Sequence, residues 1–121
     1  GDAPPQVEIE TKVKPPQEPK RVYARLPAGS TFYQLSDYFQ PNETFFVFSI
    51  FPDDPKTASI NLTDDPETLE YFLTRELTHQ NVCEYPSDRK PSVENVREVE
   101  PGSAKLTSDY WTLKTCIKLD W

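Results

Sequence analysis

Residues 45–68, FFVFSIFPDDPKTASINLTDDPET, decide the fold of this chain. Residues 45–51 form a continuous apolar, β-favouring run, which predicts a central strand covered on both faces. After an Asp-Asp-Pro sequence, apolar and polar residues alternate over 58–62, which predicts a second strand. The stretch therefore predicts two strands marked off by two turns. Ala58, Ile60 and Leu62 are expected to point inward from the second strand, and Ser59, Asn61 and Thr63 outward.

The Asp-Asp-Pro sequence occurs twice, at residues 53–55 and 64–66, and its aspartates are either metal ligands or turn residues. Neither copy has the spaced acids and central glycine of an EF-hand calcium loop. Asp favours turns and Pro fixes the backbone, so two turns are the better interpretation. The second copy is ambiguous, because Asp65 and Pro66 are also typical of a helix start. Residues 67–79 therefore predict either a short helix or a further strand.

The other segments predict short elements joined by turns, in keeping with thirteen prolines and three glycines. Residues 1–21 read as a Pro-rich arm or an edge strand, and residues 22–121 as a single domain. Residues 84–108 are polar and predict a long loop, holding at most one strand at 93–99. The clearest amphipathic strand is 110–121. Its inward residues are Trp111, Leu113, Ile117, Leu119 and Trp121.

Two further strand candidates, residues 22–26 and 31–39, complete the elements. The fold class predicted from them is mainly β, an antiparallel Greek-key sandwich of the Ig-like kind. The short helix at 67–79 is compatible with this fold, and an α+β arrangement is the alternative.

Composition argues against several classes of partner. The net charge of the 121 residues is −7, which disfavours nucleic acid, because binding to a phosphate backbone needs clustered Lys and Arg. No segment approaches the roughly 20 apolar residues of a membrane span. Methionine is absent and the chain begins Gly1-Asp2, which indicates a processed or excised piece with no signal peptide.

Cysteines and sequons point together to the secretory pathway. The two cysteines, Cys83 and Cys116, predict one disulfide. Asn42-Glu43-Thr44 and Asn61-Leu62-Thr63 are N-glycosylation sequons. We therefore expect a glycoprotein that is secreted or is the extracellular part of a membrane protein.

Catalytic motifs are missing from the sequence. The one histidine, His79, has no nearby cysteine or second histidine that would suggest zinc. No Gly-rich phosphate loop occurs, and no carboxylate pair stands in an apolar context that would raise a pKa. The sequence predicts a protein that is not an enzyme and has no cofactor.

Several segments follow one another as they do in a known family. A turn at 26–30 follows the first strand, and strand-like segments at 59–62 and 69–73 precede Thr-Arg-Glu-Leu at 74–77. Together with the last predicted strand, at 110–120, this order resembles an extracellular cadherin repeat, although no specific motif is shared. The resemblance implies a seven-stranded Greek-key sandwich that mediates adhesion between cells.

The same resemblance bears on calcium. It places Glu76 and Asp120 at acidic positions that bind calcium in cadherin repeats. Thr74, however, stands where those repeats carry a calcium-binding aspartate, and no linker of the Asp-x-Asn-Asp-Asn type is present. Glu76 and Asp120 are thus weak calcium candidates, and no metal site is expected.

The predicted function is binding of another, extracellular protein by an adhesion module or receptor ectodomain. Contact candidates come from the long polar loop and are Tyr85, Arg89, Lys90 and Val93. Two alternatives remain open at this point. One is a secreted binder of a small molecule or carbohydrate, and the other is a pathogen-derived decoy of a host receptor or cytokine.

Overall fold

A computed structural model describes residues 18–76, 81–86 and 90–121. Most of the predicted arm or edge strand at 1–21, together with His79 and Arg89, therefore lies outside the described residues. The elements in chain order are β1 (Lys20–Ala24), β2 (Thr31–Phe32), β3 (Leu35–Ser36), β4 (Phe46–Ile50), β5 (Thr57–Leu62), α2 (Pro66–Tyr71), the π-helix η1 (Phe72–Glu76), β6 (Cys83–Glu84), β7 (Arg97–Glu100), β8 (Gly102–Thr107), β9 (Tyr110–Thr115) and β10 (Ile117–Asp120).

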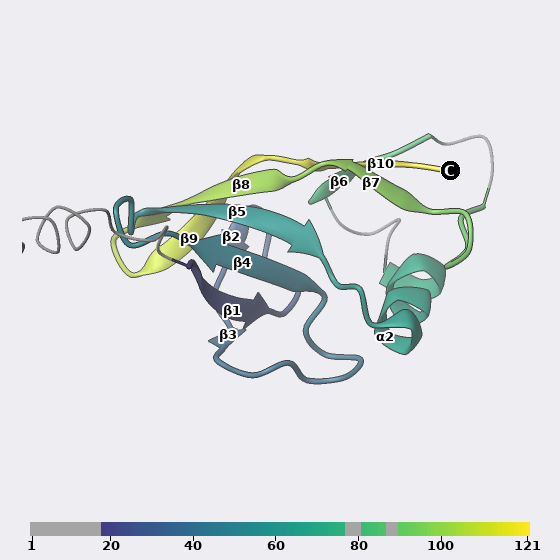
Figure 1. The fold of residues 1–121 in the computed structure, drawn as a ribbon, viewed down its shortest axis with the longest axis horizontal. Coiled ribbons are helices and arrows are strands. Elements are labelled where there is room, and N and C mark those ends of the chain that lie inside the picture. Colours follow the sequence, from purple (N-terminus) through teal and green to yellow (C-terminus); the bar gives the residue numbers. More distant parts are fainter. Residues whose placement is uncertain (1–17, 77–80, 87–89) are drawn as a thin grey trace, which may run out of the picture.

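A seven-stranded sheet of order β2-β9-β8-β5-β4-β1-β3 rolls up on itself (Figure 1). Its edge strand β2 pairs with β9, and Phe32 lies opposite Trp111. The other edge strand, β3, pairs with β1, and Leu35 lies opposite Ala24. Only two residues separate β2 from β3, so the two edges of the sheet are at most about 11 Å apart along the chain. The residues from 31 to 36, which we call the closing segment, therefore join both edges.

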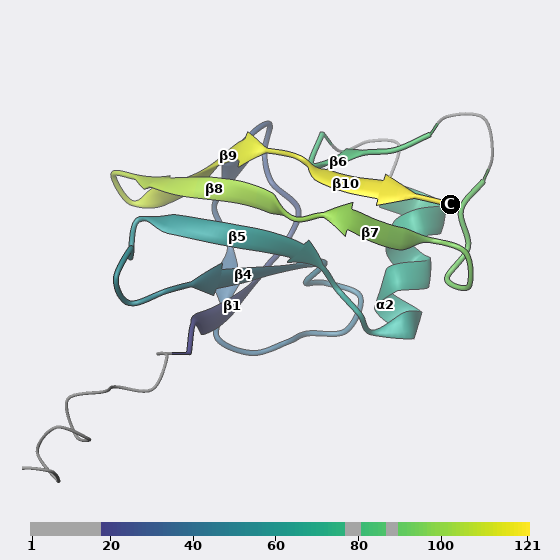
Figure 2. The ribbon, with the colours of Figure 1, turned by 45° about the horizontal axis from the view of Figure 1, so that its top comes forward.

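A smaller sheet of order β6-β10-β7 extends from the large one. The β8–β9 hairpin continues past Pro101 as β7 and past Cys116 as β10, so two strands of one sheet run into the other. Figure 2 shows β7 and β10 carrying on from β8 and β9 over the end where α2 lies. The carboxylate of Glu98 in β7 accepts hydrogen bonds from the Leu62 N–H (2.9 Å) and from the Asn61 side-chain amide, which ties β7 to the end of β5.

Aromatic rings fill the interior of the rolled sheet. The rings of Trp111 and Phe48 touch at 5.8 Å between centroids, although their strands β9 and β4 are separated by β5 and β8 in the sheet. The chain of contacts continues from Phe48 to Phe32 (5.0 Å), to Phe46 (5.9 Å) and to Phe72 of η1 (5.6 Å). Opposite walls thus pack face to face as in a β-sandwich, and the helical segment closes one end.

The predicted fold class is confirmed for the described residues: they are mainly β, with one short α-helix, and their strands pair antiparallel except β6 and β10, which are parallel. The predicted strand at 22–26 is β1, which begins at Lys20, two residues before the predicted domain boundary. The predicted strand at 31–39 is instead two short strands, because its residues change partner from β9 to β1. The predicted strand at 110–121 is broken at Cys116 between β9 and β10.

The central strand at 45–51 is confirmed as β4, flanked by β1 and β5. Its predicted burial on both faces is wrong, because only one face of a rolled sheet meets the interior. Phe46 and Phe48 are fully buried, Val47 is half-buried, and Phe51 is 46% exposed. Phe45 is buried by the helical segment, through ring contacts with Tyr71 and Phe72.

Along β5, Ala58 and Ile60 are buried as predicted. Thr63 is also buried, which corrects its predicted place on the solvent face. Its N–H donates to the Phe45 carbonyl (2.9 Å), and its hydroxyl accepts from the Asp65 N–H (3.2 Å). The residue therefore belongs to the turn that leads into α2.

The strand β8 lies within 84–108, which the sequence predicts to be loop. Small residues hide this strand, because its two buried positions are Gly102 and Ala104. A Cβ on Gly102 would stand 2.7 Å from the Thr115 carbonyl oxygen, so this position admits no side chain. A strand lined by small residues lacks the bulky alternation from which strands are recognised.

The two Asp-Asp-Pro sequences have different structures. Residues 52–56 form the β4–β5 turn, in which the Asp54 N–H donates to the Phe51 carbonyl at 3.0 Å. The second copy begins the helix, and the Asp65 side chain accepts from the Thr68 N–H at 3.0 Å. Pro66 occupies the first turn of α2, and Glu67 adds a negative charge there. Of the two alternatives that the sequence allows after the second copy, a helix or a strand, the structure has the helix.

This difference predicts unequal effects of removing the two aspartates. Asp65→Ala is expected to lower the free energy of unfolding by about 1 kcal/mol, because the cap of α2 is lost. Asp54→Ala, the matched control, is expected to change it by less than about 0.5 kcal/mol, since the turn uses backbone hydrogen bonds. Urea denaturation measures both values. Equal losses in the two variants would contradict the assignment of cap and turn.

Candidate functional site

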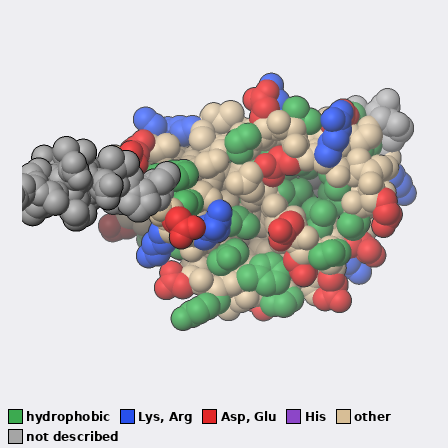
Figure 3. All heavy atoms as spheres, viewed as in Figure 1, with side chains coloured by type: hydrophobic (Ala, Val, Ile, Leu, Met, Phe, Trp, Pro, Cys, Tyr) green, Lys and Arg blue, Asp and Glu red, His purple; other side chains and the backbone are tan. Residues whose placement is uncertain are grey.

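Two open grooves meet at the end of the rolled sheet where α2 lies. The first, here called the tyrosine groove, has a volume of about 410 Å³. The second, here called the helix groove, has a volume of about 600 Å³. Asn42 and Tyr71 line both grooves and form the boundary between them. Figure 3 shows acidic and hydrophobic side chains intermixed on the visible face at this end of the molecule.

The tyrosine groove is built by the closing segment and the loops on either side of it. The loop between β1 and β2 supplies its apolar wall, and the closing segment supplies Tyr33. Tyr33 is 55% exposed and contacts Tyr110 of β9, which is 47% exposed, with their ring centroids 4.6 Å apart. The lining residues are Arg25, Leu26, Pro27, Ala28, Tyr33, Gln34, Asn42, Glu43, Phe45, Tyr71 and Glu76.

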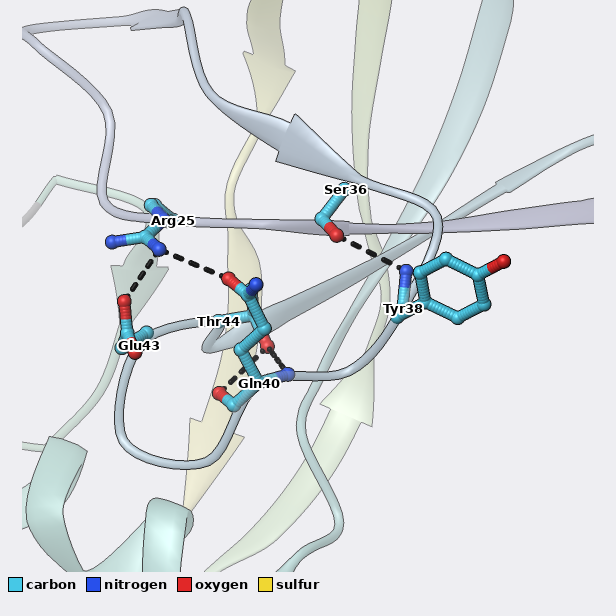
Figure 4. A network of polar contacts seen from close by, with 6 residues as sticks. All are labelled: Arg25, Ser36, Tyr38, Gln40, Glu43 and Thr44. Atoms are coloured by element: carbon cyan, nitrogen blue, oxygen red, sulfur yellow. Dashed lines mark hydrogen bonds and ion pairs between the residues drawn. The ribbon is translucent and has the colours of Figure 1, made fainter.

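A network of polar contacts orders the wall that contains Arg25 (Figure 4). The Arg25 guanidinium forms an ion pair with Glu43 and donates to the side-chain carbonyl of Gln40 at 2.9 Å. The Gln40 N–H donates to the Thr44 hydroxyl at 2.9 Å, and that hydroxyl donates to the Gln40 carbonyl at 3.1 Å. Thr44 is buried. The loop between β3 and β4 is thus held firmly against β1.

The helix groove runs along α2 and is more acidic. Three carboxylates line it, those of Glu67, Glu70 and Glu94, and no ion pair engages them among the described residues. The guanidinium of Arg75 lies 4.6 Å from the centre of the Tyr71 ring. Arg75 reaches this ring from η1, a rare π-helical turn of the kind often found at functional sites.

The two sequons occupy different surroundings. Asn42 is exposed, its φ is 60°, and its N–H donates to the buried hydroxyl of Thr68 at 3.0 Å. Its side-chain amide has no hydrogen-bond partner among the described residues. Asn61 is half-buried, and its amide donates to Glu98. The predicted outward position of Asn61 thus holds only in part, because β7 lies beside it.

The contact candidates predicted from the long loop are scattered. Tyr85 is half-buried and stacks on Trp121 with centroids 5.5 Å apart, so it supports the small sheet. Lys90 is exposed, whereas Val93 lies at the wall of the helix groove. The fourth candidate, Arg89, is outside the described residues. The structure brings only Val93 to either groove.

The calcium candidates have separate surroundings. Glu76 lines the tyrosine groove, while Asp120 in β10 accepts from Arg97 at 2.7 Å. Within residues 18–76, 81–86 and 90–121, no group of three or more His, Cys, Asp or Glu side chains could hold a metal ion. Over the same residues, no helix is long and apolar enough to span a membrane.

Both cysteines are free thiols, so the predicted disulfide is not formed in the structure. Cys83 is buried opposite Ile117, in the pairing of β6 with β10. Cys116 is only half-buried, and its thiol donates to the Asn81 carbonyl at 3.2 Å. Cys83 is therefore part of the hydrophobic core. Burial, with the nearby Cys116 and Glu98, raises the pKa of Cys83 to about 12.

Sequence patterns alone do not predict the tyrosines and the arginine that line the two grooves. Tyr33 stands far from Tyr71 and Arg75 in sequence, and only the roll of the sheet brings the walls of the tyrosine groove together. The available signal was the run of aromatic residues at 32–39, which alternates poorly and so does not suit an ordinary strand.

Comparison of the chain with models of protein families, with curated proteins and with solved structures finds no match.

The surroundings of the two thiols predict unequal reactivity. In the reduced native protein, iodoacetamide is expected to modify Cys116 before Cys83, because alkylation requires an accessible thiolate. Burial also raises the pKa of Cys116, with a contribution from Glu84, so both thiols react more slowly than in the unfolded chain. Peptide mass spectrometry over time measures each rate.

The Cys116→Ser variant serves as the control, since its remaining thiol should react only as the protein unfolds. In the chain without the substitution, unfolded in urea, the two cysteines should react at similar rates. Equal rates in the native protein would contradict the buried position of Cys83.

Proposed function

We propose that the protein is a non-enzymatic, extracellular protein-binding module that engages its partner across the tyrosine groove. The observation that carries the proposal is the exposed Tyr33–Tyr110 ring contact beside this groove, whose mixed polar and apolar lining includes Tyr33 and Arg25. Aromatic residues and arginine are enriched at protein interfaces and at the hot spots within them. Tyr33 offers a large contact area with few rotatable bonds, so little conformational entropy is lost on binding.

The hydrogen-bonded wall of the tyrosine groove supports the same proposal. The Arg25–Gln40–Thr44 network fixes one wall before a partner arrives, and a preorganised surface binds with a smaller ordering cost. The interior of the roll is occupied by aromatic rings, which favours a surface contact over the alternative of a small ligand held among those rings. A host-receptor decoy would use the same kind of surface, and adhesion is the activity that the cadherin-like order of segments suggests.

The extracellular setting rests on the sequons and the cysteines. Asn42 stands at the boundary of the grooves, and its side-chain amide has no partner within the described part of the chain, which suits glycan attachment. Cys83 lies in β6 and Cys116 directly precedes β10, in which Ile117 lies opposite Cys83. In an oxidising compartment, a disulfide between the two cysteines would form if their thiols came together before β6 packs against the core.

Binding of the glycosylated protein to cell surfaces tests the proposal. We expect Tyr33→Ala to reduce binding by about tenfold or more, since hot-spot truncations commonly cost above 1 kcal/mol. Tyr38→Ala is the matched control, because Tyr38 is 78% exposed but lines neither groove. Flow cytometry with labelled protein gives the affinities, and an arm with EDTA tests for calcium dependence. Equal binding by both variants would exclude the tyrosine groove as the contact site.

A further inference from the structure

Asn42 combines three properties that no other described asparagine shares. It belongs to a sequon, its side-chain amide has no hydrogen-bond partner among the described residues, and it stands at the rim of the helix groove. Its backbone is anchored, since its N–H donates to the hydroxyl of Thr68 within α2. Anything attached to the Asn42 side chain therefore starts from a fixed point beside that groove.

The second sequon offers a contrast. The amide of Asn61 already donates to Glu98, and the residue is half-buried between β5 and β7. A glycan on Asn61 would have to share that amide and leave past β7. The structure thus favours Asn42 over Asn61 as the site where an attached sugar can rest on the protein.

The lining of the helix groove suits a sugar. Its volume of about 600 Å³ is that of a small-ligand site. Pro66 and Val93 offer apolar surface on which the carbon–hydrogen face of a pyranose ring can pack. The carboxylates of Glu70 and Glu94 accept hydrogen bonds, and the hydroxyl and acetamide groups of N-acetylglucosamine donate them.

We propose that the helix groove holds the first sugars of an N-linked glycan attached to Asn42. The glycan then covers the helix side of the boundary formed by Asn42 and Tyr71, and leaves the Tyr33 side of the tyrosine groove as the approach for a partner. The proposal rests on the extracellular setting of the proposed function, but it requires no partner to be bound.

Hydroxyl-radical labelling of protein made in a glycosylating secretory host tests the proposal. Glycopeptide mass spectrometry should first show a glycan on Asn42. Relative to the same chain made unglycosylated in bacteria, Val93 and Tyr71 should lose at least half of their labelling, because a glycan is bulky and would cover them. Labelling at Tyr110 should be unchanged. The protection should survive trimming of the glycan to its first N-acetylglucosamine.

Variants separate contact from simple shielding. Asn42→Gln should restore labelling of Val93, and Asn61→Gln, the matched control, should not. The double variant Glu70→Gln and Glu94→Gln keeps the sequon but weakens the acceptors, so it should restore part of the labelling. An unoccupied Asn42, equal labelling with and without the glycan, or protection that disappears on trimming would overturn the proposal. None of these results depends on cell-surface binding, so the failure of the partner site would be recognised separately.

Discussion

Two residues, Tyr33 and Gln34, impose the constraint on which the rest of the structure depends. They are all that separates β2, paired with β9, from β3, paired with β1. A connection this short cannot span an open sheet of this many strands, so the sheet must roll up. Rolling gives the sheet an interior face, and the rings of Phe32, Phe48 and Trp111 fill it. It also leaves the large sheet with only very short edge strands.

The same constraint builds the candidate site. The tyrosine groove is lined by the closing segment and by the loops that enter and leave it, so its walls meet only when both edges of the sheet are joined. Arg25, directly after β1, contacts Glu43 and Gln40, and that contact fixes the relative positions of two loops. The candidate site and the closure of the fold therefore use the same segment, in which Phe32 is fully buried and its neighbour Tyr33 is exposed.

Local patterns in the sequence predict part of this arrangement. The apolar run before Pro52 predicts β4, the alternation after Lys56 predicts β5, and Asp65 with Pro66 predicts the start of α2. The closing segment is unpredictable from local pattern, because its residues pair with two different strands. β8 is hidden by Gly102 and Ala104, which are both buried, and at Gly102 a Cβ would meet the Thr115 carbonyl of the neighbouring strand β9. The groove lining was missed for the same reason, since it depends on long-range pairing.

Cross-strand contacts in solution test the closure most directly. Nuclear Overhauser effects from isotope-labelled monomeric protein should connect Phe32 with Trp111 and, in the same molecule, Leu35 with Ala24, because paired antiparallel residues lie about 4.5–5.5 Å apart. The account predicts both sets of contacts in one folded species. A spectrum that contains the contacts of Leu35 with Ala24 but lacks those of Phe32 with Trp111 would show an open sheet and contradict it.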